Sequence, residues 1–210
     1  MKKYFNMLDL FLNRFLNRCV RTCVIICTIA CPALTQGQSQ PAASNQAATA
    51  PSEYSAVSRE YHLKAAFLRY VAQYIEWPSE SLQVGSINIC VIGQVPYFEG
   101  INSINGKVVN ERVLVISKLL DAKDAKGHCQ ILFVAKTEED KSKQIINTLQ
   151  DLPVLTFGDM DHFSENGGDM NFYIANNRLA IMTNLPVIDK AKLKINPEML
   201  RLVTVVPKTT

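Results

Sequence analysis

The stretch CQILFVAKTEEDKSKQIINTLQDLPVLTFG, residues 129–158, decides the fold. Its two ends, CQILFVA and LPVLTFG, both predict strands, and CQILFVA is apolar on both faces, as a strand covered on both sides of a sheet is. The segment between them, TEEDKSKQIINTLQ, has the composition of a helix. Thr137 is placed to cap this helix, and acidic residues crowd its first turn. The stretch therefore predicts a strand, a helix and a second strand.

The same alternation continues toward the N-terminus. SINICVIG (86–93) is another apolar strand, PYFEGINSI (96–104) is a turn with a short helix, and a further strand lies around 113–117. Strands that alternate with helices are typical of a parallel sheet with helices packed on it. We therefore expect an α/β fold with a mixed, mainly parallel sheet and helices on both faces.

Toward the C-terminus, GGDMNFYIANNRLAIMTNL (167–185) predicts an antiparallel hairpin. Asparagine tolerates positive φ, so Asn176 and Asn177 fit a two-residue type I′ turn. This turn sets Phe172 opposite Ile181 and Ile174 opposite Leu179, with these four apolar side chains on one face. A slip of one residue would move them to the other face, so the register is self-consistent and a core hairpin is expected.

The clearest helix is AVSREYHLKAAFLRYVAQYIEWP (56–78), which Pro78 ends. Glu60 and Lys64 form a favourable pair one helical turn apart. Trp77 is interpreted as a lid on the core rather than a residue that stacks on a ligand. The apolar stripe of this helix consists of Val57, Tyr61, Ala65, Leu68, Val71 and Ile75.

The tail predicts two more helices. The first covers 185–193, and Pro197 suits the first turn of the last one. Four apolar side chains of the last helix are expected to face the core: Met199, Leu202, Val203 and Val206.

The N-terminus has the features of an export signal. Residues 1–35 carry five basic residues and one acidic residue, with the apolar run TCVIICTIAC (22–31) and small residues after it. Residues 36–55 are rich in Ala, Gln, Ser and Pro and predict a disordered linker, so the folded domain is expected at 56–207. Lipid anchoring at Cys31 is an alternative to simple cleavage. Beyond residue 35 there are 17 basic and 18 acidic residues, which argues against a nucleic-acid partner.

Only Cys90 and Cys129 lie beyond the expected signal peptide. In an oxidising compartment two remaining cysteines predict one disulfide. A bridge over a loop of this length would stabilise the fold by roughly 4 kcal/mol. The alternative is two buried, unpaired thiols.

The sequence offers no catalytic constellation, no metal site and no cofactor motif. Asp159, Asp161 and His162 lie close together in GDMDHF, but a metal site needs more ligands, so a polar surface loop is expected there. No nucleophile elbow, Walker sequence or dinucleotide-binding glycine pattern is present. A speculative ligand or partner site is the turn after the strand 86–93, where Pro96, Tyr97 and Phe98 follow. The alternative is an ordinary connection.

Six segments occur in the order seen in YfiR-like periplasmic regulatory proteins, which this chain resembles over residues 57–206. The most specific are the helix that ends in Trp77-Pro78 and the hairpin from Gly167-Gly168 through Asn176-Asn177. The segments are YHLKAAFLRYVAQYIEWP, INICVIGQVPYF, GKVVNERVLVI, CQILFVA, LPVLTFGDMDHFSENGGDMNFYIANNRLAIMTNL and AKLKINPEMLRLVTVV.

The resemblance implies a Rossmann-like fold without nucleotide chemistry, export to the periplasm and a homodimer. It implies a regulator that represses the periplasmic sensing domain of a membrane signalling protein, either a diguanylate cyclase or a sensor kinase. A cyclase partner would connect it to cyclic di-GMP and biofilm formation. Cys90 and Cys129 fall where the family has one disulfide, whereas a second family disulfide has no counterpart here. The alternatives are a small-ligand sensor domain and, less favoured, an enzyme.

Overall fold

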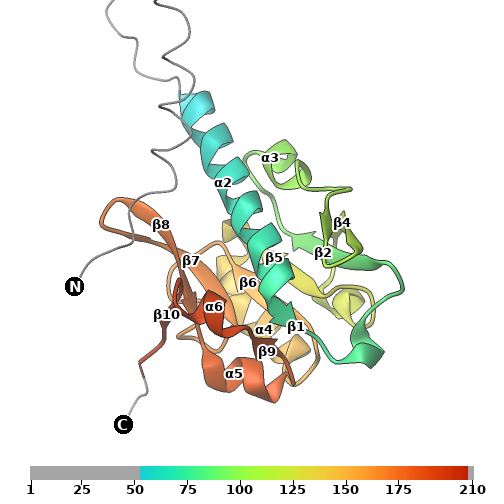
Figure 1. Ribbon diagram of the computed structural model, residues 1–210. Coiled ribbons are helices and arrows are strands. Elements are labelled where there is room, and N and C mark those ends of the chain that lie inside the picture. The colour runs from blue at the N-terminus through green and yellow to red at the C-terminus, as the bar shows by residue number, and fades with distance from the viewer. Residues whose placement is uncertain (1–52, 208–210) are drawn as a thin grey trace, which may run out of the picture. The chain divides into compact units, whose positions relative to one another are not determined.

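The computed structural model describes residues 53–207 as an α/β fold around one large mixed sheet (Figure 1). The strand order is β10-β8-β7-β6-β5-β2-β4-β3, and a separate two-stranded sheet pairs β1 with β9. The strands of the large sheet are β2 (Ser86–Ile92), β3 (Val108–Val109), β4 (Arg112–Leu119), β5 (Ile131–Val134), β6 (Leu155–Gly158), β7 (Met170–Ala175), β8 (Arg178–Thr183) and β10 (Thr204–Val205).

Strands β4, β2, β5, β6 and β7 run parallel, and β7 turns back into β8 as an antiparallel hairpin. β10 joins β8 in parallel, and β3 closes the other edge antiparallel to β4. The mainly parallel sheet with a C-terminal hairpin that the sequence predicted is therefore confirmed.

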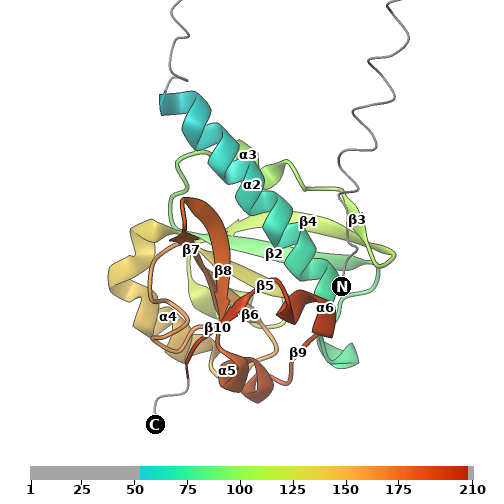
Figure 2. The same ribbon diagram turned by 60° about the vertical axis from the view of Figure 1, so that its left-hand side comes forward.

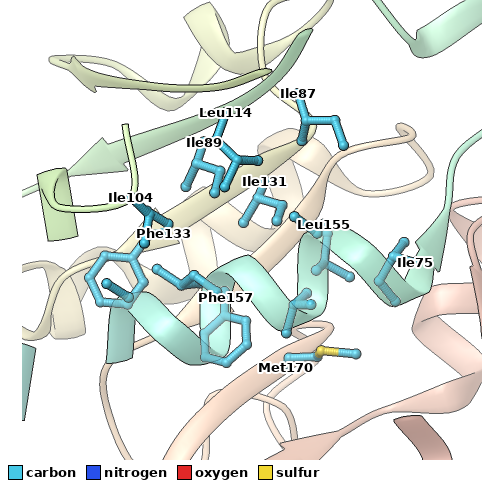
Figure 3. Close-up of a cluster of buried hydrophobic side chains, with 14 of the residues drawn as sticks. Ile75, Ile87, Ile89, Ile104, Leu114, Ile131, Phe133, Leu155, Phe157 and Met170 are labelled. Atoms are coloured by element: carbon cyan, nitrogen blue, oxygen red, sulfur yellow. The ribbon is translucent and has the colours of Figure 1, made fainter. Parts of the chain in front are cut away.

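The central strands carry apolar side chains on both faces of the sheet, and helices pack on both faces and remove these side chains from water. All four residues of β5 and of β6 are buried. One face packs against α2 (Glu53–Tyr74), and the labelled side chains Ile89, Ile131 and Phe133 gather between the strands and this helix (Figure 3). The other face packs against α4 (Ser142–Leu149) and the 3₁₀ helix η3 (Ala122–Ala125).

Helix α2 crosses one face of the sheet (Figure 2) and begins at Glu53, inside the stretch expected to be a linker. It ends at Tyr74 rather than at Trp77, because Ile75 and Glu76 form β1 and pair with Lys194 and Ile195 of β9. Trp77 is buried, as expected of a lid, and its indole N–H donates to the backbone oxygen of Gln130. The buried side chains of α2 include the expected Tyr61, Ala65, Leu68 and Val71, and also Lys64 and Ala72.

The hairpin has the predicted register, with Phe172 opposite Ile181 and Ile174 opposite Leu179. Asn176 and Asn177 both have positive φ, 50° and 58°, as the type I′ turn requires. The expectation that this apolar face lies wholly in the core was wrong at the tip, where Ile174 is 68% exposed. Only the base of the hairpin reaches the core.

Another local expectation, the helix cap at Thr137, was also wrong. Thr137 does not cap a helix, because its hydroxyl accepts a hydrogen bond from the backbone N–H of Gln94. The segment instead starts as the 3₁₀ helix η4 (Lys136–Lys141) before α4 begins.

The last helix, α6 (Pro197–Leu200), is capped by Asn196 and is short, because the chain then forms β10. Met199 is buried as expected, whereas Leu202 is 67% exposed. The remaining helices are η2 (Ser79–Ser81), α3 (Phe98–Asn102) and α5 (Leu185–Lys190). The expected signal peptide 1–35 and Cys31 lie outside the described residues.

Candidate functional site

A crevice of about 540 Å³ opens where the strand order of the sheet reverses. The chain passes from β2 to β4 on one side and returns to β5 on the other side of β2. Open α/β sheets bind ligands beyond the carboxyl ends of their strands at such a point. We call this hollow the switch-point crevice. Its walls include Glu60, Tyr61, Lys64, Thr137, Asp159 and Phe172.

The inner wall of the switch-point crevice holds a buried polar cluster. The ammonium of Lys64 lies 2.5 Å from a carboxylate oxygen of Glu60 and 2.6 Å from Oδ1 of Asp159. The hydroxyl of Tyr61 donates to Oδ2 of Asp159 at 2.9 Å. Lys64 also lies 4.4 Å from the centre of the Tyr61 ring. The ammonium of Lys64 is therefore paired with two carboxylates, and the Tyr61 hydroxyl is hydrogen-bonded to one of them.

Burial dominates the electrostatics of the polar cluster. It raises the pKa of Asp159, while the charge and hydrogen bonds of Lys64 and the hydrogen bond of Tyr61 act in the opposite direction. Burial, followed by the charge of Asp159, raises the pKa of Tyr61, which keeps the phenol a neutral donor. Because both carboxylate oxygens of Asp159 are engaged, the cluster has the character of a rigid wall more than of an acid–base pair.

The prediction of a polar surface loop at GDMDHF was wrong for Asp159, which is buried. Its side chain turns inward to meet Lys64, whereas Asp161 and His162 are exposed. His162 contacts Glu165, whose hydrogen bond and charge raise the pKa of the imidazole. Among residues 53–207, no three His, Cys, Asp or Glu side chains are grouped so that they could hold a metal ion.

The three residues proposed from the sequence as a ligand or partner site are not brought together. Pro96 is exposed and lines the switch-point crevice. Tyr97 packs against His62, with ring centres 5.5 Å apart. Phe98 lies under the ammonium of Lys118, 3.9 Å from its ring centre. Of these three residues, Pro96 alone lines the crevice, beside Gln94 of the same turn.

An apolar groove of about 280 Å³ lies along the outer side of α2. Its walls come from α2, from β8 and from the segment around α6. We call it the α2 groove, and its lining residues are Leu63, Ala66, Phe67, Tyr70, Ile181, Met199, Leu202 and Val203. Leu63 is 48% exposed and Leu202 is 67% exposed, so large apolar side chains meet solvent here. The α2 groove was not predicted from the sequence, although Leu63, Phe67 and Tyr70 form a second apolar stripe at helical spacing.

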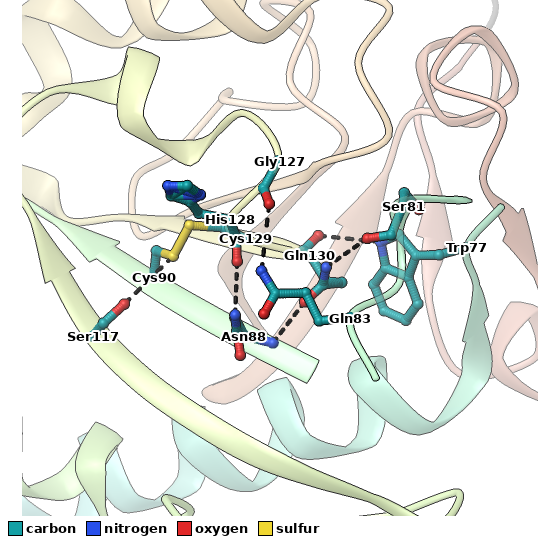
Figure 4. The surroundings of a disulfide bond; sticks show 10 residues. All are labelled: Trp77, Ser81, Gln83, Asn88, Cys90, Ser117, Gly127, His128, Cys129 and Gln130. Atoms are coloured by element: carbon teal, nitrogen blue, oxygen red, sulfur yellow. Dashed lines mark hydrogen bonds between the residues drawn. A yellow bond between two sulfur atoms is a disulfide. The ribbon is translucent and has the colours of Figure 1, made fainter. Parts of the chain in front are cut away.

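Cys90 and Cys129 are joined in the predicted disulfide, with Cα atoms 5.9 Å apart (Figure 4). Both cysteines are buried, and the Ser117 hydroxyl lies beside Cys90. Next to the bridge, the Gln130 side chain accepts from the Asn88 backbone N–H and donates to the Ser81 oxygen. The disulfide therefore ties the central strand β2 to the segment that enters β5, within a region already ordered by hydrogen bonds.

No helix within residues 53–207 has the length and apolar character needed to cross a membrane.

Comparisons with known proteins give one family and several similar folds. The sequence pattern of a family described as YfiR/HmsC-like matches residues 61–204. No curated protein matches the chain. A conserved domain protein from Vibrio cholerae O1 biovar eltor has a similar structure, with a TM-score of 0.51, 10% identity, and coverage of 68% of this chain and 60% of that chain. This similarity shows the fold alone.

The ABC domain in complex with L-Trp from Streptococcus pneumonia has a TM-score of 0.47 and 9% identity, over 60% of this chain and 57% of that chain. The present chain thus spans less than two thirds of the length of either solved structure.

Proposed function

Because the chain belongs to the YfiR/HmsC-like family, we propose that it is a periplasmic regulatory protein that binds and represses the sensing domain of a membrane signalling protein. The partner that fits this role best is a diguanylate cyclase, so that the protein controls cyclic di-GMP signalling. Family membership supports regulation rather than catalysis. Export to the periplasm and formation of a homodimer belong to the same proposal.

Beside family membership, the structural observation that supports a contact with a partner protein is the α2 groove. A contiguous apolar hollow with exposed walls on a protein surface is typical of a binding site for another protein. Leu63, Phe67 and Tyr70 project from one rigid helix, so a partner meets a surface that needs little ordering on binding. The occupant we expect is an apolar helix face of the receptor's periplasmic domain.

Repression requires that the protein distinguishes two states of the receptor. A regulator shifts a two-state equilibrium only by its difference in affinity for the two states. A hundredfold preference for the inactive state would shift the equilibrium by about 2.7 kcal/mol. The α2 groove would supply this preference if only the inactive receptor presents the matching helix face.

The experiment measures binding and output together. The purified full chain is titrated by calorimetry with the periplasmic domain of a candidate diguanylate cyclase from the same organism, and cyclic di-GMP is measured in cells with and without the gene. We expect a saturable complex and a rise of cyclic di-GMP on deletion. Absence of a complex together with unchanged cyclic di-GMP would contradict the proposal.

A second candidate function is a periplasmic small-ligand sensor domain that serves another receptor, such as a histidine kinase. The switch-point crevice favours it, because its position at the reversal of strand order is where such sheets bind small molecules. Thermal-shift screening of the full chain against metabolites tests this role. A flat response to every compound counts against it.

A further inference from the structure

The switch-point crevice has a polar side with an excess of negative charge. Lys64 and Asp159 are buried and paired with each other, so they leave no charge free for a ligand. The other charged side chains of the lining are three carboxylates and one ammonium group, all exposed: Glu60, Glu139, Asp161 and Lys136. Three against one leaves an excess of two negative charges on the part of the lining that a ligand can reach.

The opposite side of the crevice is apolar and belongs to the β7–β8 hairpin. Phe172 is buried, whereas Ile174, on the same face, is 68% exposed. Leu179 lies directly opposite Ile174 in the register and is partly buried. All three side chains line the crevice. A large aliphatic side chain that meets solvent at the wall of a hollow is typical of a surface that binds another molecule.

Most of the rim is open to solvent. Its neutral residues Gln94, Pro96 and Thr137 are exposed, as are its four unburied charged side chains. Sites for small molecules usually enclose most of the surface of the ligand. An open hollow with one acidic and one apolar side instead matches a segment of polypeptide, which can present charged and apolar side chains together.

The charge of the lining selects the chemistry of this segment. Acidic side chains would meet Glu139 and Asp161 with the same sign of charge, which is costly at an interface. Lysine or arginine side chains would pair with these carboxylates, and their aliphatic stems can lie on the apolar side. The charge complementarity therefore favours a basic segment.

We propose that the switch-point crevice docks a short basic segment of a partner protein. An aliphatic side chain of this segment packs on Ile174 and Leu179, and the lysine or arginine side chains next to it pair with Glu139 and Asp161. No residue lines both this crevice and the α2 groove, so the contact is separate from the proposed receptor contact. It can be tested without the receptor.

The test uses two hexapeptides blocked at both ends, Gly-Lys-Leu-Leu-Lys-Gly and its acidic match Gly-Glu-Leu-Leu-Glu-Gly. The full chain, labelled with ¹⁵N, is titrated with each peptide at pH 7 and low ionic strength, and amide shifts are followed by NMR. We expect the basic peptide to bind at least about ten-fold more tightly, with shifts at Thr137, Asp161 and Ile174. Equal affinities, or shifts confined to the α2 groove or to other regions, would overturn the proposal.

Two further probes separate a polypeptide segment from a small cation. Gly-Lys-Gly-Gly-Lys-Gly lacks the apolar side chains and should bind about five-fold more weakly than the leucine peptide. Lysine amide carries the cation alone and should bind more weakly still. If lysine amide binds as tightly as the leucine peptide, the crevice is a site for small cations and the proposal is overturned.

Variants at exposed positions make the test specific, and substitutions at such positions change stability little. Glu139→Gln combined with Asp161→Asn should reduce the preference for the basic peptide to less than about three-fold. Ile174→Ser should weaken the leucine peptide and leave the glycine peptide unchanged. Asp124→Asn is the control, because Asp124 is an exposed carboxylate of η3 that does not line the crevice, and it should keep the full preference. A preference that survives in the double variant, or that the control loses equally, would overturn the proposal.

Discussion

The ammonium of Lys64 lies 2.6 Å from Oδ1 of Asp159, with both side chains almost fully shielded from solvent. Lys64 belongs to α2 and Asp159 directly follows β6, so this ion pair connects α2 to the carboxyl end of a parallel strand. Removal of one partner leaves the other charge buried without compensation. Such an ion pair adds little net stability but is costly to break.

Lys64→Met should therefore lower the free energy of unfolding by about 3–5 kcal/mol, as for other broken buried pairs. Urea unfolding at pH 7 measures this. Lys141→Met is the matched control, because Lys141 pairs with Glu138 and is 70% exposed. Its loss should stay below about 1 kcal/mol. Similar losses for the two variants would contradict the buried ion pair.

Asp169 should make the fold less stable as pH rises from about 4 to about 6. Its pKa in the folded protein is about 6, above the ordinary value of an aspartate. The unfolded chain therefore loses this proton at lower pH than the folded chain, and ionisation favours unfolding. The loss amounts to about 3 kcal/mol and is complete above the folded pKa.

Urea unfolding of the unmodified chain and of Asp169→Asn at several pH values separates this effect from other titrations. The difference in unfolding free energy between the two proteins should change by about 3 kcal/mol between pH 4 and pH 6 and be constant above that range. The raised pKa of Asp159 acts in the same direction, but it is common to both proteins and cancels. A difference that does not vary with pH would refute the assignment to Asp169.

Replacement of both Cys90 and Cys129 by alanine should cost about 4 kcal/mol of unfolding free energy, because the bridge restricts a loop closed over a sequence separation of 39 residues. Denaturant unfolding with and without reductant measures this. Reductant should destabilise the unmodified chain by a similar amount and leave the double variant unchanged. A reductant effect on the double variant would point to another cause.

Leu63→Glu should weaken receptor binding by roughly 30-fold or more, because it places a charge in the apolar lining of the α2 groove. Leu63 is 48% exposed, so stability should change by only about 0.5 kcal/mol. Val84→Glu is the control, since Val84 is fully exposed and does not line the groove. Calorimetry against the receptor's periplasmic domain compares the three proteins. Equal weakening by both variants would place the contact elsewhere.

Gly168→Ala should destabilise the fold by about 1–3 kcal/mol, because a Cβ atom at Gly168 would overlap the ring of Phe163. Phe163→Leu should recover part of this loss when combined with Gly168→Ala. Thermal unfolding of the two single variants and the double variant forms a complete cycle. Additive losses would show that the ring is not the cause.

The parts of the fold that could be predicted from sequence are those with a local signal. The hairpin register follows from two asparagines that accept positive φ and from the alternation around them. Strand β5 follows from an unbroken apolar run, and β6 from a run that Thr156 interrupts. Strands of two residues, such as β1, β9 and β10, are too short to show an alternation of apolar and polar residues, so they could not be predicted from the sequence.

The candidate site was less predictable, because its contacts join distant segments. Lys64 looked like half of a surface pair with Glu60, and Asp159 looked like part of an exposed loop. Nothing in either segment indicates the other. Thr137 had the position of a helix cap. Gly93 has a positive φ, and after it the backbone N–H of Gln94 donates a hydrogen bond to the hydroxyl oxygen of Thr137. The second apolar stripe on α2 could be recognised from the sequence. Whether other elements cover this stripe depends on the complete fold and could not be predicted.

Both margins of the large sheet end in strands of two residues, β3 on one side and β10 on the other. A neighbouring molecule that lengthened the sheet at β3 or β10 would find only two strand residues to pair with there. Edge strands as short as these oppose strand-by-strand growth of the sheet from one copy of the chain to the next.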